Sequence, residues 1–204
     1  RMTSWQPEPA AIPGVNVTLA YPVYATLDTG GGDPARAPLL YVSNDARCTV
    51  EVLDVTDVRN VTKVGAFSSC PAIEYVSQTA YDPATRRLFA AAQKAGSFAV
   101  LDVADPARPM LKGLLQDADR SANASQPLAG ATGCAFDSAR GLVFVAAEGA
   151  RTLSVIDVSS SSGSIGGGDG GGGGGGGLAG GPANAALSAL RILGRVTHPA
   201  LAGE

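Results

Sequence analysis

The segment Val100-Leu101-Asp102-Val103-Ala104-Asp105-Pro106 decides the fold, because two other parts of the chain repeat its pattern. Val52-Leu53-Asp54-Val55 is the earlier copy, and Val155-Ile156-Asp157-Val158 is the later one. The blocks align without a gap, because each aspartate follows an apolar residue at the same distance along the chain: Leu40, Leu88 and Val143. Self-similarity at a nearly fixed period indicates one structural unit that occurs three times.

Each unit is expected to contain four short β-strands. In the second unit these are about 76–81, 88–92, 98–103 and 110–115, all rich in β-branched, aromatic or other apolar residues and separated by turn residues. Helical periodicity is absent from them. Four strands in a repeat of roughly 40–50 residues are typical of a propeller blade. The sequence therefore predicts an all-β fold, a β-propeller of four-stranded antiparallel blades with about three to four blades present.

Further columns of the repeat support this alignment. Tyr41, Phe89 and Phe144 occupy one column, and Gly65 and Gly113 follow the aspartates of the first two units at equal spacing. Upstream, the turn at 82–87 is similar to that at 137–141, and we align 33–36 with both. The segments around Asp54, Asp102 and Asp157 resemble the LVIVD repeat and are similar to YVTN-type propeller repeats of the WD40-like superfamily. The resemblance implies the architecture and leaves the activity open.

The chain divides into an N-terminal extension, 1–20, and propeller blades over 21–204, at about 21–68, 72–115 and 131–196. A Ser/Gly-rich insertion, 159–189, contains eight consecutive glycines and is expected to be flexible. It lacks the Lys-Ser/Thr of a phosphate-binding loop. Because propellers close with four to eight blades, we expect a fragment of a longer propeller.

Composition excludes several functions. The net charge is −3 with 15 Lys+Arg, which provides no basic field for nucleic acid. No apolar run is long enough to span a membrane. A single histidine, His198, disfavours histidine-rich metal sites, and no catalytic triad or glycine-flanked serine occurs. We therefore assign no catalytic residue, cofactor site or metal site from the sequence. The repeated Asp54, Asp102 and Asp157 are expected to hydrogen-bond the turns that follow their strands.

Cysteines and glycosylation sequons indicate an oxidising, extracellular or cell-surface location. In a four-strand meander, the turn between strands two and three lies on the same side as the link to the next blade. Cys48 and Cys70 occupy these places and are a candidate disulfide, whereas Cys134 is expected to be a small buried apolar residue. The sequons give three candidate glycosylation sites: Asn16, Asn60 and Asn123.

Functional residues of a propeller are expected at its central channel, where Glu74, Tyr75 and Gln78 are the candidate lining residues. The leading hypothesis is a non-catalytic repeat module that binds protein or glycan partners outside the cell. One alternative is part of a lactonase-like or metal-dependent propeller enzyme whose active site includes blades outside this sequence. Another is a cytoplasmic scaffold, in which Cys48 and Cys70 would be free thiols.

Overall fold

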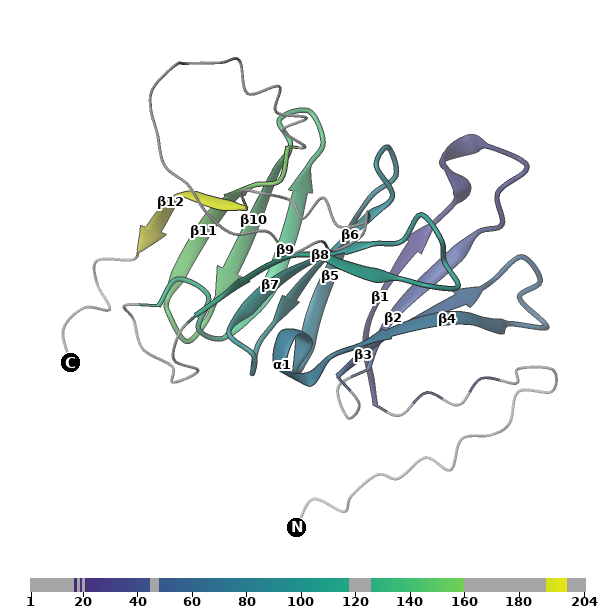
Figure 1. The fold of residues 1–204 in the computed structure, drawn as a ribbon, viewed down its shortest axis with the longest axis horizontal. Coiled ribbons are helices and arrows are strands. Elements are labelled where there is room, and N and C mark those ends of the chain that lie inside the picture. Colours follow the sequence, from purple (N-terminus) through teal and green to yellow (C-terminus); the bar gives the residue numbers. More distant parts are fainter. Residues whose placement is uncertain are drawn as a thin grey trace, which may run out of the picture.

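The computed structural model describes residues 17, 19, 21–44, 48–117, 126–159 and 190–197. Three four-stranded antiparallel sheets stand side by side in chain order, as the ribbon in Figure 1 shows. Within each sheet the strands are neighbours in sequence order. This arrangement confirms the predicted all-β fold, an incomplete set of propeller blades.

The first blade consists of β1 (Pro22–Asp28), β2 (Leu39–Asn44), β3 (Thr49–Asp54) and β4 (Thr62–Ser68). The second consists of β5 (Val76–Asp82), β6 (Arg87–Ala92), β7 (Ser97–Asp102) and β8 (Met110–Gln116). The third consists of β9 (Ala131–Asp137), β10 (Leu142–Ala147), β11 (Thr152–Asp157) and β12 (Arg191–Thr197). Two short helical turns, η1 (Gly30–Gly32) and α1 (Cys70–Ile73), were not expected from the sequence. No helix in the described ranges has the length and hydropathy needed to cross a bilayer.

The repeat columns of the sequence become equivalent places in successive sheets. Tyr41 pairs with Val52, Phe89 with Val100, and Phe144 with Val155, each between the second and third strand of its blade. Because strand neighbours alternate between the two faces of a sheet, these aromatic residues all lie on the same face of their blades, the face directed toward the following blade. The gapless alignment of the three blocks therefore reflects one β-hairpin repeated three times.

The upstream alignment of the first blade was wrong. Asp28 ends β1 and pairs with Leu39, in the same way that Asp82 ends β5 and Asp137 ends β9. Asp33 lies in the longer loop between β1 and β2, which also contains η1. The misalignment arose because both aspartates start a turn: the Asp33 carboxylate accepts the Ala35 N–H at 2.9 Å. Local turn chemistry does not reveal which aspartate ends the strand.

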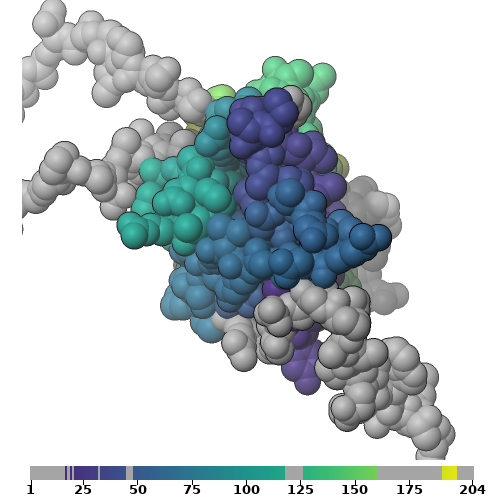
Figure 2. Space-filling view, turned by 90° about the vertical axis from the view of Figure 1, so that its right-hand side faces the viewer, coloured from purple at the N-terminus to yellow at the C-terminus, as the bar shows by residue number. Residues whose placement is uncertain are grey.

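Two apolar clusters join the blades. Between the first and second blades, Tyr41, Val50 and Val52 pack with Leu88 and Leu101. Between the second and third, residues that lie on the other face of the second blade, among them Phe89, Phe98 and Val100, pack with Val143, Val145 and Ile156. The central blade is therefore buried on both faces, which explains why its strands are almost continuously apolar. Figure 2 shows the row of blades from the side of the first blade, which faces the viewer.

The repeated outer-strand glycine marks a close contact between successive blades. A Cβ added to Gly65 on β4 would lie 2.8 Å from the carbonyl oxygen of Ala107 and would also clash with that of Pro106. Both carbonyls belong to the turn between β7 and β8 of the next blade. At the equivalent Gly194 on β12, such a Cβ meets no atom of the described residues within 4 Å. Gly65 is therefore required by tertiary packing, whereas no such contact with the described residues requires Gly194.

Candidate functional site

The aspartates at the ends of the third strands bind their own turns, as the sequence predicts. Asp54 accepts the Thr56 N–H at 2.8 Å, Asp102 the Ala104 N–H at 2.9 Å, and Asp157 the Ser159 N–H at 2.9 Å. Hydrogen bonds from the Thr56 hydroxyl and backbone N–H lower the pKa of Asp54. The pKa of Asp157 is lowered in the same way by Ser159. All three carboxylates thus act as hydrogen-bond acceptors for the turns that follow their strands.

The aspartates at the ends of the first strands each pair with an arginine. The carboxylate–guanidinium distance is 2.7 Å for Asp28–Arg36, 3.3 Å for Asp82–Arg87 and 3.4 Å for Asp137–Arg140. The first two carboxylates are buried, and the third is partly exposed. A buried carboxylate without a partner is strongly unfavourable, so the arginine is a structural requirement at the first two sites.

Arg87 connects the second blade with the third. Its guanidinium donates to the Val158 carbonyl oxygen at 2.6 Å, to the Thr85 hydroxyl at 2.6 Å, and to Asp82 at 3.3 Å. It also lies over the Phe89 ring, 5.6 Å from the centroid. Burial acts to raise the pKa of Asp82, but hydrogen bonds from Thr85, Arg87 and the turn outweigh it, and the pKa is lowered.

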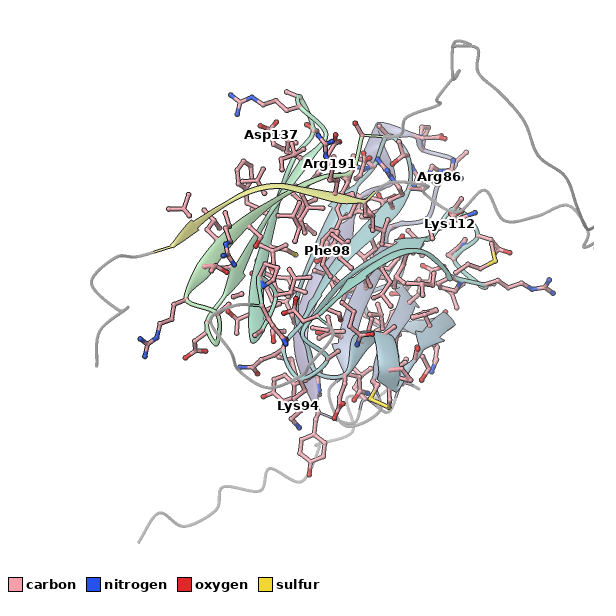
Figure 3. All side chains as sticks on the ribbon, turned by 60° about the vertical axis from the view of Figure 1, so that its left-hand side comes forward. Arg86, Lys94, Phe98, Lys112, Asp137 and Arg191 are labelled. Atoms are coloured by element: carbon pink, nitrogen blue, oxygen red, sulfur yellow. A yellow bond between two sulfur atoms is a disulfide. The ribbon has the colours of Figure 1, made fainter. Side chains whose placement is uncertain are left out.

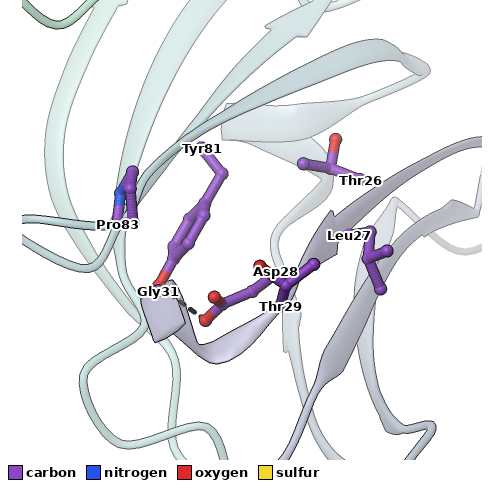
Figure 4. Close-up of a pocket in the computed structure, with 7 residues that line it drawn as sticks. All are labelled: Thr26, Leu27, Asp28, Thr29, Gly31, Tyr81 and Pro83. Carbon is purple, nitrogen blue, oxygen red and sulfur yellow. Dashed lines mark hydrogen bonds between the residues drawn. The ribbon is translucent and has the colours of Figure 1, made fainter. Parts of the chain in front are cut away.

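A pocket of about 310 Å³ opens beside Asp28, where the end of β1 meets the end of β5. Figure 4 shows its lining residues: Thr26, Leu27, Asp28, Thr29, Gly31, Tyr81 and Pro83. We call it the Asp28 pocket. The Tyr81 hydroxyl donates to Asp28 at 2.7 Å and accepts from Arg36 at 3.2 Å. The other oxygen of Asp28 accepts the Gly30 N–H at 2.9 Å.

Three side chains of the Asp28 pocket, those of Thr26, Asp28 and Tyr81, are therefore already hydrogen-bonded within the protein. Burial, together with the hydrogen bond to Asp28, raises the pKa of Tyr81, so its hydroxyl stays protonated near neutral pH. The hydrogen bond to Tyr81 raises the pKa of Arg36 despite its partial burial. A protonated phenol, a carboxylate and a guanidinium in mutual contact hold two blades together, and none of them is poised as a general base.

A second polar surface runs across the three first strands, which line the channel side of the blades. Gln78 on β5 donates to the Tyr24 hydroxyl of β1 at 3.4 Å and accepts the Cys134 N–H of β9 at 3.2 Å. The Thr26 and Thr79 hydroxyls lie 2.6 Å apart and also join β1 to β5. We call this surface the channel wall.

The candidate lining residues of the sequence have different places on this wall. Gln78 is central to it, because it contacts both neighbouring blades. Tyr75 precedes β5 at the entrance of the wall, where the Lys94 ammonium lies 4.9 Å from its ring centroid. Glu74 is half-buried at the end of α1, and its carbonyl accepts the Ala95 N–H at 3.1 Å. The inner strands near 24–28 and 75–82 are where the sequence places functional residues of a propeller. The contact of Asp28 with Arg36 and Tyr81 was not predicted, because only the arrangement of neighbouring blades brings Tyr81 to this pair.

Cys48 and Cys70 are joined by a disulfide, with their Cα atoms 4.8 Å apart. It links the turn before β3 to the start of α1, the connection that leads into the second blade. Cys134 is buried with its Sγ 3.6 Å from the Gln78 carbonyl oxygen, and burial raises the pKa of its thiol to about 12. No group of three or more His, Cys, Asp or Glu that could hold a metal ion occurs among the described residues.

Of the glycosylation candidates, Asn60 lies exposed in the turn between β3 and β4, where its N–H donates to the Asp57 carbonyl oxygen at 2.9 Å. Asn16, Asn123 and His198 lie outside the described residues, as does nearly all of the Ser/Gly-rich insertion.

No protein-family model matches the chain, and no curated protein sequence matches it. Solved structures are similar, and β-propellers are among them. A functionally unknown protein from Desulfotomaculum acetoxidans gives a TM-score of 0.56 at 13% identity, over 87% of this chain and 42% of that protein. A protein from Lactobacillus plantarum gives 0.56 at 14% identity, over 86% and 42%. The periplasmic gluconolactonase PpgL of Pseudomonas aeruginosa gives 0.51 at 12% identity, over 67% and 35%.

At these identities the likeness concerns the fold alone. The chain spans about two fifths of the length of the first two matching structures.

Proposed function

We propose that this chain is part of a non-catalytic β-propeller that binds a protein or glycan partner at its channel wall. The proposal rests on one observation, namely that five aspartate carboxylates of the repeats bind groups of the protein itself. Asp54, Asp102 and Asp157 bind turn N–H groups, while Asp28 and Asp82 are buried beside arginines. A carboxylate fixed in this way stabilises structure and is poorly placed to accept a proton from a substrate.

The repeat type is proposed to be LVIVD-like or YVTN-like. Each Val/Leu/Ile-Asp-Val segment forms the end of a third strand, and its aspartate starts the turn toward the fourth strand. The motif thus has the same structural task in all three blades, which supports a common repeat origin and says nothing of a ligand.

We further propose an extracellular or cell-surface location. The disulfide between Cys48 and Cys70 favours an oxidising compartment. The exposed Asn60 is accessible to glycosylation, and the packing of a preceding blade would not hide it. The equivalent turn of the second blade, between β7 and β8, does pack against a preceding blade, at Gly65. Arg108 has the place of Asn60 in that turn and is nevertheless exposed.

The proposal is tested with the full chain produced by a eukaryotic secretory host. Mass spectrometry is expected to find an oxidised Cys48–Cys70 pair and a glycan on Asn60, which is lost in Asn60→Gln. Lactone and ester hydrolysis is then measured with and without added divalent metals. Hydrolysis above that of heat-denatured protein would contradict a non-catalytic role. Free thiols at both cysteines in native material would instead favour the cytoplasmic alternative.

A further inference from the structure

Two tyrosines at the entrance of the channel wall have a backbone conformation that favours glycine. Tyr21 precedes β1 with φ of 59°, and Tyr75 precedes β5 with φ of 60°. The third blade has Gly130 at the equivalent place, with φ of 69°. Bulky L-residues are unfavourable in this left-handed region, and such outliers concentrate at functional sites. Two blades therefore keep a side chain at a place where glycine would fold with less strain.

Tyr21 and Tyr75 lie at one end of the channel wall. Tyr24 follows Tyr21, and Gln78 follows Tyr75, at the same distance along the chain. Because Tyr24 and Gln78 contact each other at 3.4 Å, the two tyrosines that precede them lie at the same end of adjacent strands. Tyr21 is 74% exposed and Tyr24 37% exposed. Figure 3 places Lys94 at this end of the sheets, opposite Arg86, Asp137 and Arg191.

Lys94 adds a positive charge to this cluster. Its ammonium lies over the Tyr75 ring, and it takes part in none of the ion pairs between side chains of the described ranges. A cation beside aromatic rings at the surface attracts an anionic group. The Gln78 side chain and the tyrosine hydroxyls provide both donors and acceptors for hydrogen bonds.

We propose that Tyr21, Tyr24, Tyr75, Gln78 and Lys94, the tyrosine mouth, bind an acidic glycan. The inference rests on the proposed function as a binding module and names its ligand class. Aromatic faces stack on the apolar C–H face of a sugar ring, while the amide and hydroxyl groups bind sugar hydroxyls. The Lys94 ammonium pairs with the carboxylate or sulfate of the sugar. A single cation suits one acidic sugar residue, in contrast to the basic surfaces that nucleic acids require.

The decisive variants are Tyr21→Gly and Tyr75→Gly. Each removes a ring and at the same time relieves the backbone strain, so the folded protein is expected to be as stable as the parent or more stable. The matched control is Arg86→Gly, because Arg86 has φ of 52° where the third blade has Gly141, at the opposite end of the sheets. A purely structural role predicts the same behaviour for all three variants.

The probe is a printed array of neutral, uronic-acid-containing, sialylated and sulfated oligosaccharides, followed by calorimetric titration of the strongest acidic member. We expect at least tenfold weaker binding for both tyrosine variants and unchanged binding for Arg86→Gly. Lys94→Gln should weaken binding and reduce its dependence on salt concentration.

The inference is overturned if no acidic glycan binds, or if binding survives in both tyrosine variants. Binding of a protein partner alone would overturn it but leave the proposed function intact. Lactone or ester turnover would instead contradict the proposed function.

Discussion

Gly65→Ala should destabilise the protein, although alanine is normally the better residue in a strand. The new methyl group would lie 2.8 Å from the Ala107 carbonyl oxygen and would clash with that of Pro106, so the backbone turn of the next blade must move. Overpacking of this kind costs about 1–3 kcal/mol. The gain from replacing a strand glycine offsets roughly 0.5–1 kcal/mol of this. We expect a net loss of about 1 kcal/mol, which lowers Tm by roughly 2–4 °C in a chain of this size.

The measurement is urea unfolding and thermal melting followed by far-UV circular dichroism, with Gly194→Ala as the control. Gly194 has the same place in the third blade, but a Cβ there meets no atom within 4 Å in the part of the chain that the structure describes. The control is therefore expected to be neutral or up to about 1 kcal/mol more stable than the parent. Equal stability of the two variants would refute the idea that the outer-strand glycine is a contact point between blades.

Four further results are expected. Replacing both Cys48 and Cys70 by serine should lower the free energy of unfolding by roughly 3 kcal/mol, because the disulfide joins residues 22 positions apart; an unchanged urea midpoint would contradict this. Arg87→Ala should cost about 3 kcal/mol, because it leaves the buried Asp82 without its cation, and the loss should diminish in acid. Because folding lowers the pKa of Asp82, its carboxylate stabilises the folded protein above pH 3.8, and this contribution is lost as the pH falls through the pKa of the folded state. In Asp82→Asn, the free energy of unfolding should therefore fall less steeply as the pH is lowered in this range. The thiol of Cys134, with its pKa raised from 9.0 to about 12, should resist thiol reagents at pH 8 until the protein unfolds, and stability should decline as the pH rises from 9 toward 12.

The architecture could be predicted from local pattern because each blade repeats the same local chemistry. Apolar strands bounded by turn residues, with an aspartate after the third strand, appear three times, and Asp54, Asp102 and Asp157 each make the same turn hydrogen bond. The prediction was wrong where a loop changes length. Asp33 resembles the turn of Asp82, but Asp28 ends the strand.

The candidate site depended on contacts between blades. Gln78 lies far from both Tyr24 and Cys134 in the sequence, and the three meet because three first strands stand next to one another. Asp28 and Tyr81 meet for the same reason.

The amino-acid sequence alone thus determined the repeat, its strands, its aspartate turns and the candidate cysteine pair, since all of these follow from neighbours along the chain or from the order of strands in one blade. Only the tertiary structure decided which polar side chains share a surface and why Gly65 must lack a side chain. Both depend on how one blade is placed against the next, a distance and an angle that no local pattern of residues encodes.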